Sequence, residues 1–83
     1  MNFTPIDNNG TVDGFCLIKS LDKKTSSKGD TYLDMTLSDA GGEINAKLWR
    51  YNPAVHGEYE INELVKIRGV ISQYNGNDQL KID

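Results

Sequence analysis

The sequence predicts an all-β domain, a small barrel of five strands in Greek-key order with a short helical connector between the third and fourth strands. Apolar and polar residues alternate over 31–37 and again over 43–49, with the period of two that half-buried strands require. Turn residues separate such runs, most clearly at Asn75-Gly76, a pair that favours tight hairpins. These observations predict strands joined by short turns.

The first strand is expected over residues 11–22, which are rich in Val, Phe, Leu and Ile, and Gly14 is expected to mark a bulge or bend in it. Residues 22–30 contain no apolar side chain, so we expect them to form a polar, basic loop that joins the first two strands. The 83 residues are enough for one hydrophobic core, which predicts a single domain over 1–83 with residues 1–10 as an N-terminal extension.

The second and third strands are expected to form a hairpin around the turn at 39–42. Their apolar residues must share the core, and their other residues must share the opposite, solvent-facing surface. The inward set is Leu33, Met35, Leu37, Ile44, Ala46 and Leu48. The outward set is Tyr32, Asp34, Thr36, Asn45, Lys47 and Trp49.

The second half of the chain predicts a connector and a further hairpin. Asn52-Pro53 is typical of a helix start, and Gly57 limits that helix to about one turn. A fourth strand is expected over 63–71, with a bend at Gly69, and a last strand over 79–82. This order matches the OB fold, a five-stranded Greek-key barrel. An SH3-like barrel is the main alternative, although it does not usually place its helical segment there.

The charges limit the partners that the sequence predicts. A net charge of −3 argues against strong, indiscriminate binding to phosphate. The distribution is uneven, however, and we expect a modest positive groove on an otherwise acidic molecule. The basic residues that would form it are Lys19, Lys23, Lys24, Lys28, Lys47 and Arg50.

The sequence contains no recognisable catalytic set. One cysteine, Cys16, and one histidine, His56, cannot form a conventional zinc site, and no Ser or Cys nucleophile has an organised partner. We therefore expect no enzyme activity and no cofactor in this chain. Apolar runs do not exceed four residues and no signal-peptide pattern is present, so we expect a cytoplasmic protein without a membrane partner.

Several segments carry a family resemblance that covers nearly the whole chain. They are residues 14–20, 29–33, 37–39, 42–49 and 74–80. Together they resemble the N-terminal OB domain of YhaM-type 3′→5′ exoribonucleases. The pattern Gly-Glu-Ile, small, basic, apolar, aromatic over 42–49 is shared more widely with replication-protein and anticodon-binding OB domains.

The resemblance implies that this chain binds the substrate of a larger enzyme. In that family the OB domain precedes an HD-type phosphohydrolase domain, which holds divalent metal ions and performs hydrolysis. His56 alone cannot supply an HD site, and the chain stops at Asp83, so we interpret it as a fragment. The partners that this implies are single-stranded RNA or DNA and a C-terminal HD domain.

Trp49 is the first candidate for binding, because an outward aromatic residue at the end of the third strand is placed to stack on a base. The alternative is that its ring only covers the barrel end near Tyr51 and Tyr59. Lysines in the loops suit backbone phosphates, and turn residues such as Asn75 could reach a base edge, although the turn itself also requires Asn-Gly. The predicted binding residues are Lys23, Lys24, Lys28, Tyr32, Thr36, Asn45, Lys47, Trp49, Arg50, Tyr74, Asn75 and Gln79.

Two functions from different classes remain open from the sequence. The first is an accessory domain that grips single-stranded nucleic acid and feeds a 3′ end to a nuclease domain. The second is a protein-interaction or oligomerisation module, because OB folds also bind proteins and a fold alone does not fix function.

Overall fold

The computed structural model describes residues 3–5, 7 and 9–82. Of Tyr74 it describes the backbone but not the side chain. Its elements, in chain order, are β1 (Thr4–Pro5), β2 (Thr11–Thr25), β3 (Thr31–Asp39), β4 (Gly42–Leu48), α1 (Pro53–His56), β5 (Leu64–Tyr74) and β6 (Asn77–Ile82). No helix in this described part is long and apolar enough to cross a bilayer.

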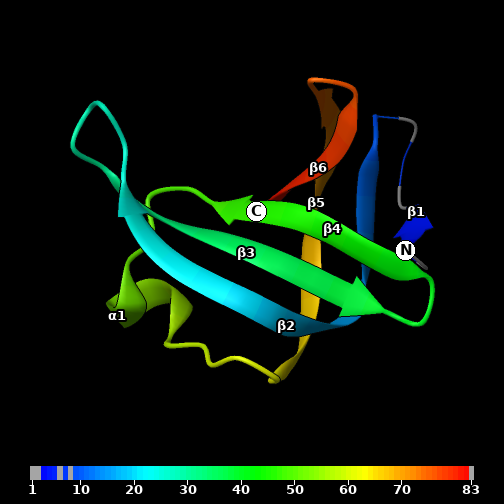
Figure 1. The fold of residues 1–83 in the computed structure, drawn as a ribbon, viewed down its shortest axis with the longest axis horizontal. Helices are drawn as coiled ribbons and strands as arrows, with labels where there is room; N and C mark the ends of the chain where they lie inside the picture. The colour runs from blue at the N-terminus through cyan, green and yellow to red at the C-terminus, as the bar shows by residue number, and fades with distance from the viewer. Residues whose placement is uncertain (1–2, 6, 8, 83) are drawn as a thin grey trace.

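Five of the strands pair in a closed ring (Figure 1). The sheet order is β1-β2-β3-β4-β6-β5, and β5 also pairs with β2. All pairings are antiparallel except that of β4 with β6, which is parallel over Asn45–Lys47 and Gln79–Lys81. The predicted all-β fold, with its short helical connector after the third long strand, is therefore confirmed.

The core follows the predicted alternation. All six residues of the inward set on β3 and β4 are buried, and β2 and β6 add further apolar side chains. The buried residues are Val12, Cys16, Ile18, Leu33, Met35, Leu37, Ile44, Ala46, Leu48, Tyr51 and Leu80. Because these side chains fill the interior of the ring, the outward residues of β3 and β4 are left on one solvent-facing surface.

The connector α1 forms as its sequence predicts. The Asn52 side chain accepts a hydrogen bond from the Ala54 amide at 3.0 Å, Pro53 occupies the first turn, and Gly57 ends the helix with φ of 83°. No residue of α1 is buried. Tyr51 and Tyr59 hold the connector instead, because their hydroxyls donate to the carbonyl oxygens of Gly57 and His56, each at 2.6 Å.

A short strand lies near the start of the chain. Thr4 and Pro5 pair with Asp13 and Val12 of β2, so residues 1–10 contain a short sixth strand. The Phe3 ring packs against the backbone at Gly14, where a Cβ would lie 2.9 Å from the Phe3 ring. Close packing therefore explains Gly14.

The predicted bulge at Gly14 is wrong. The register of β2 against β3 shifts between Ile18 and Ser20, which places the bulge at Lys19. Pairing runs without interruption through Gly14, which lies opposite Ile67 of β5. The bulge thus falls in the middle of β2, at the point where the strand passes from its pairing with β5 to its pairing with β3.

Candidate functional site

An aromatic pair stands on the solvent-facing surface of β3 and β4. The rings of Tyr32 and Trp49 lie 4.5 Å apart between centroids, with 32° between their planes. Trp49 keeps 40% of its surface exposed. The pair offers an aromatic surface that is open to solvent.

The chain turn after β4 sets the position of Trp49. Arg50 has φ of 54°, a left-handed conformation that is uncommon for a residue other than glycine. The Tyr51 amide then donates to the carbonyl oxygen of Thr31 at 2.8 Å, which ties the turn to the start of β3. Trp49 and Arg50 are thereby held beside Tyr32 at the end of the sheet.

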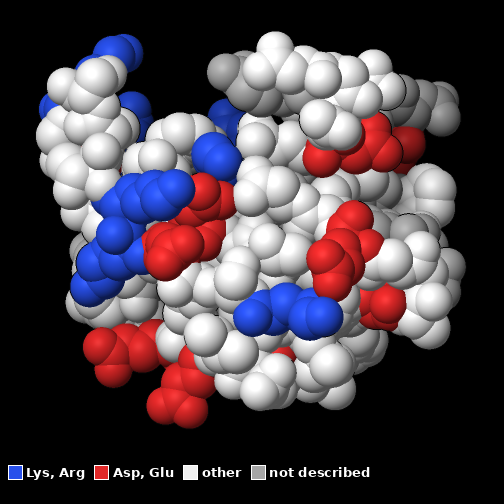
Figure 2. Space-filling model, in the orientation of Figure 1, with Lys and Arg blue, Asp and Glu red and all other residues white. Residues whose placement is uncertain are grey.

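An open hollow lies next to the aromatic pair. One wall is the loop between β2 and β3, and the other comes from the turn after β4 and from β6. Its lining residues are Ser26, Ser27, Lys28, Asp30, Trp49, Arg50 and Lys81. Figure 1 shows this loop and the β5–β6 hairpin rising on the same side of β3 and β4, and Figure 2 shows the gap between the two projections.

The β2–β3 loop is fixed by its own hydrogen bonds. The Ser26 amide donates to the Asp30 carbonyl at 2.8 Å, and the Gly29 amide donates to the Ser26 carbonyl at 2.9 Å. The Ser26 hydroxyl accepts from the Asp30 amide at 3.2 Å. Gly29, with φ of 89°, makes the tight return possible. The loop therefore presents Lys28 at a defined rim of the hollow.

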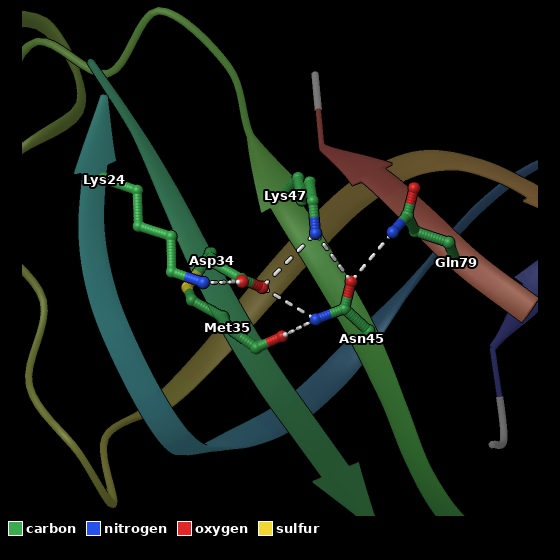
Figure 3. Close-up of polar contacts among 6 residues, drawn as sticks. All are labelled: Lys24, Asp34, Met35, Asn45, Lys47 and Gln79. Atoms are coloured by element: carbon green, nitrogen blue, oxygen red, sulfur yellow. Dashed lines mark hydrogen bonds and ion pairs between the residues drawn. The ribbon is translucent and has the colours of Figure 1, made fainter. Parts of the chain in front are cut away.

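A polar network covers the surface between the aromatic pair and the rest of the sheet (Figure 3). Asp34 accepts from Lys24 at 2.8 Å and from Asn45 at 2.7 Å, and it pairs with Lys47 at 3.4 Å. Asn45 in turn accepts from Lys47 at 3.1 Å and from Gln79 at 2.9 Å. Side chains from β2, β3, β4 and β6 are thereby joined in one network.

The protonation of Asp34 reflects this network. Its partial burial favours the neutral acid, but the hydrogen bonds from Lys24 and Asn45 and the charge of Lys47 outweigh that effect and lower the pKa of the Asp34 carboxyl below its ordinary value. The same hydrogen bond raises the pKa of the Lys24 ammonium. Asp34 is therefore ionised at neutral pH and neutralises part of the charge of two lysines.

The structure separates two lysines that the sequence places together in a loop. β2 continues to Thr25, so Lys23 and Lys24 lie on a strand and that prediction is wrong for both. Neighbouring strand residues point to opposite faces. Lys24 pairs with Tyr32 on the outward face, whereas Lys23 pairs with Leu33 and lies 5.9 Å from the Tyr51 ring centre.

The remaining predicted residues fall in two places. Thr36 is opposite Asn45 on the outward face, within the surface described above. Asn75 is exposed at the tip of the β5–β6 hairpin, where φ of 53° at Asn75 and 80° at Gly76 fit the predicted tight turn. The Tyr74 side chain lies outside the described part of the chain.

Lys81 belongs to the hollow but is absent from the predicted binding set. It is opposite Lys47 in the parallel pairing of β4 with β6, and it lines the hollow with Trp49. The alternation of the last strand places Lys81 outward, yet only the closure of the barrel shows which surface it joins. Phe15 is also exposed, and its ring centre lies 5.7 Å from Lys66 Nζ on β5, away from this site.

Comparison with known proteins identifies the relatives of this chain, although no protein-family model matches it. It is 43% identical over 72 residues to the 3′-5′ exoribonuclease YhaM of Listeria monocytogenes serotype 4b (strain CLIP80459), an alignment that covers 87% of this chain and 23% of the relative. The corresponding protein of Listeria innocua serovar 6a is 42% identical over 72 residues, with the same coverage. The chain thus spans about a quarter of the length of the curated relatives it matches.

Solved structures support the fold. One chain of a replication protein A heterotrimer bound to single-stranded DNA is similar to this chain, with a TM-score of 0.70 and 12% identity. The match covers 88% of this chain and 52% of the replication protein A chain. The second OB-fold domain of replication protein A from Methanococcus maripaludis matches 90% of this chain and 80% of that one, with a TM-score of 0.67 and 15% identity. At such identities the likeness concerns the fold, and it confirms the OB fold.

Proposed function

We propose that this chain, a homologue of one segment of the YhaM 3′-5′ exoribonucleases, binds single-stranded RNA or DNA and presents it to an exoribonuclease domain. The observation that supports this best is the Tyr32–Trp49 pair, in which Trp49 is exposed, beside a hollow rimmed by Lys28, Arg50 and Lys81. Aromatic rings bind the faces of unstacked bases, and cations at their side suit the phosphates.

Single strands fit this surface better than duplexes. Stacking on Tyr32 or Trp49 requires a base face that a duplex keeps covered by its neighbours, and stacking tolerates any base. Gln79 lies on the same surface and is proposed to reach a base edge, whereas the Asn45 side chain is held by hydrogen bonds within the network. Asn75 and the Tyr74 position are proposed to close the site from the β5–β6 hairpin.

Hydrolysis is proposed to take place outside these residues. The relatives are named as exoribonucleases, and the chain corresponds to about a quarter of their length. We therefore propose that an HD-type domain in the remainder of a longer protein holds the divalent metal ions and cleaves the strand. The role of residues 1–83 is then to bind and orient the substrate.

Titration of Trp49 fluorescence tests the binding role directly, since Trp49 is the sole tryptophan. A single-stranded oligouridylate is expected to quench it. Binding should be weaker at 200 mM than at 50 mM KCl, because lysine and arginine side chains displace counterions from the phosphates and added salt opposes that release. A duplex of the same length is expected to quench it much less. Absence of any quenching by single strands at low salt would exclude the proposal.

Phe15→Ala is the matched control for Trp49→Ala. Phe15 is 62% exposed, but it lies on the β2–β5 side of the barrel, away from the hollow. Trp49→Ala should lose single-strand binding, measured by anisotropy of a labelled oligonucleotide, whereas Phe15→Ala should keep it. Equal losses in both variants would mean that the aromatic surface next to Tyr32 is not the binding site.

A second candidate function is an oligomerisation or protein-interaction module. The observation that favours it is the outward face of β2 and β5, where Phe15, Leu17 and Leu64 are all exposed and Leu17 is opposite Leu64. Such apolar neighbours on a surface often mark protein contacts. Light scattering separates the two functions, because Leu64→Ser should then change the assembly state and leave oligonucleotide binding intact.

A further inference from the structure

We propose that Asp34 limits the phosphate affinity of the proposed nucleic-acid surface by holding Lys24 and Lys47 in ion pairs. The contacts to phosphate then fall to Lys28, Arg50 and Lys81 at the hollow. This inference rests on the proposed function and deepens it. It assigns to an acidic residue in the middle of the binding surface a role that opposes binding strength.

The position of Asp34 carries the first step. It stands on β3 between the strands that bear the two lysines, with Lys24 Nζ at 2.8 Å and Lys47 Nζ at 3.4 Å (Figure 3). The Asp34 side chain is only 19% exposed, so its charge is poorly screened by water. Both oxygens are engaged, Oδ2 by Lys24 and Oδ1 by Lys47 and Asn45.

The second step is that Lys47 is not free to move toward a ligand. Its side chain is 20% exposed, and its ammonium also donates to Asn45 Oδ1 at 3.1 Å. Asn45 is fixed in turn by the hydrogen bond from Gln79 and by its own bond to the Met35 carbonyl at 3.1 Å. A phosphate could capture Lys47 only by breaking this network.

The third step is the contrast with the cations of the hollow. Lys28, Arg50 and Lys81 are exposed, and in the part of the chain that the structure describes none of them forms an ion pair. They line one hollow with Trp49, and Asp30 is the acidic residue in its lining. Figure 2 shows the resulting mixture, with acidic side chains set among basic ones below the projecting loop.

The consequence is a surface that depends on stacking more than on charge. Fewer phosphate contacts lower the affinity for the backbone, and with it the cost of releasing a bound strand. Weak backbone attraction suits a domain that must pass a strand toward a nuclease. It also fits the overall charge of −3, which repels phosphates at long range.

The salt dependence of binding measures the number of cations that contact phosphate. Single strands give a slope of about −0.7 in log K against log salt for each phosphate, so three cations predict a slope of about −2 and five predict about −3.5. Wild type is expected at the first value and Asp34→Asn at the second, with tighter binding at 50 mM KCl. The probe is a labelled ten-nucleotide oligouridylate followed by anisotropy.

Asp22→Asn is the matched control, because it removes the same charge from the same surface. Asp22 is opposite Asp34 on β2, is exposed, and has no ion pair among the described residues. Its slope should stay near that of wild type. A second pair of variants compares two lysines. By the same relation, Lys28→Met should make the slope less negative by about 0.7, whereas Lys24→Met should leave it unchanged.

The outcomes distinguish this inference from the proposed function. If wild type binds the oligonucleotide but Asp34→Asn binds more weakly or with an unchanged slope, Asp34 contacts bases or has no role, and the inference is overturned while the function stands. If neither protein binds at low salt, both are overturned. Tighter, more salt-dependent binding by Asp34→Asn, not seen with Asp22→Asn, supports the inference.

Discussion

The ring centres of Trp49 and Tyr32 lie 4.5 Å apart, although Tyr32 lies at the start of β3 and Trp49 follows the end of β4. Leu48, which precedes Trp49, is opposite Leu33, which follows Tyr32, so the antiparallel register brings both rings to the same end of the sheet. The register of β3 against β4 therefore brings the two rings together.

Loss of either ring should weaken single-strand binding by about 1–3 kcal/mol, the usual contribution of one base stacked on an aromatic side chain. Because the rings touch, Tyr32→Ala and Trp49→Ala should be non-additive, and the double variant should lose less than the sum of the two. Anisotropy titrations of the three variants complete the cycle. Strict additivity would show that the rings bind independently.

Gly69→Ala should destabilise the barrel strongly. A Cβ at Gly69 would overlap the carbonyl oxygen of Lys81 on β6, and backbone cannot easily retreat. We expect a loss of about 3 kcal/mol in the free energy of unfolding, at the upper end for overpacking. Urea denaturation of Gly14→Ala gives the contrast, with a smaller loss, because the closest atom to the added Cβ there, at 2.9 Å, belongs to the Phe3 ring, which can shift. Equal stabilities of the two variants would contradict this packing argument.

Asn75→Gly separates the turn from the ligand. Glycine adopts the left-handed conformation that Asn75 has, with φ of 53°, so the hairpin and the melting temperature should be preserved. If the Asn75 amide reaches a base edge, the variant should bind about 1 kcal/mol more weakly, the loss of one hydrogen bond. Unchanged affinity in the same anisotropy assay would leave Asn75 with a role in the turn alone.

Acid should remove the contribution of Asp34 to stability. The pKa of its carboxyl is lower in the folded state than the ordinary 3.8, so its contribution is fully present above that value and is lost as the pH falls through the lower folded pKa. At pH 6 the free energy of unfolding of Asp34→Asn should therefore be about 1 kcal/mol lower than that of wild type, because the substitution removes hydrogen bonds to a charged, partly exposed group.

Thermal unfolding at several pH values checks this expectation. The difference between wild type and Asp34→Asn should narrow below pH 3.8. Asp22→Asn, which disrupts no ion pair among the described residues, should show a small difference at every pH. A constant gap for Asp34→Asn would instead assign its effect to packing of the new side chain.

Most of the fold could be predicted because local patterns and tertiary structure agree. The alternation through Leu33 and Ile44, the Asn52-Pro53 helix start and the Asn75-Gly76 turn each depend on neighbours in sequence, and each was confirmed. The end of β2 was harder, because a strand continued by Lys23 and Lys24 has the composition of a loop. Pairing with β3, a tertiary effect, overrides that composition.

The site was predictable only in part, because some of its contacts also depend on pairing between strands that are distant in sequence. Alternation places Tyr32, Lys47 and Trp49 on one surface, and the structure brings them there. Alternation does not reveal that Asp34 also pairs with Lys24, which depends on the register of β2 against β3. Nor does it reveal that Lys81 joins the hollow, which depends on the parallel pairing of β4 with β6. Strand registers of this kind lie beyond patterns within a single segment.

The parallel pairing of β4 with β6 has a consequence for how the chain acquires its shape. Among the described residues the barrel closes there through three residue pairs, Asn45–Lys47 against Gln79–Lys81, and these come from distant parts of the chain. During synthesis, β2, β3 and β4 can form a meander early, but the ring stays open until the residues of β6 have left the ribosome. Contacts of such long sequence separation form slowly, so the apolar face of the meander stays exposed to solvent until β6 pairs with β4.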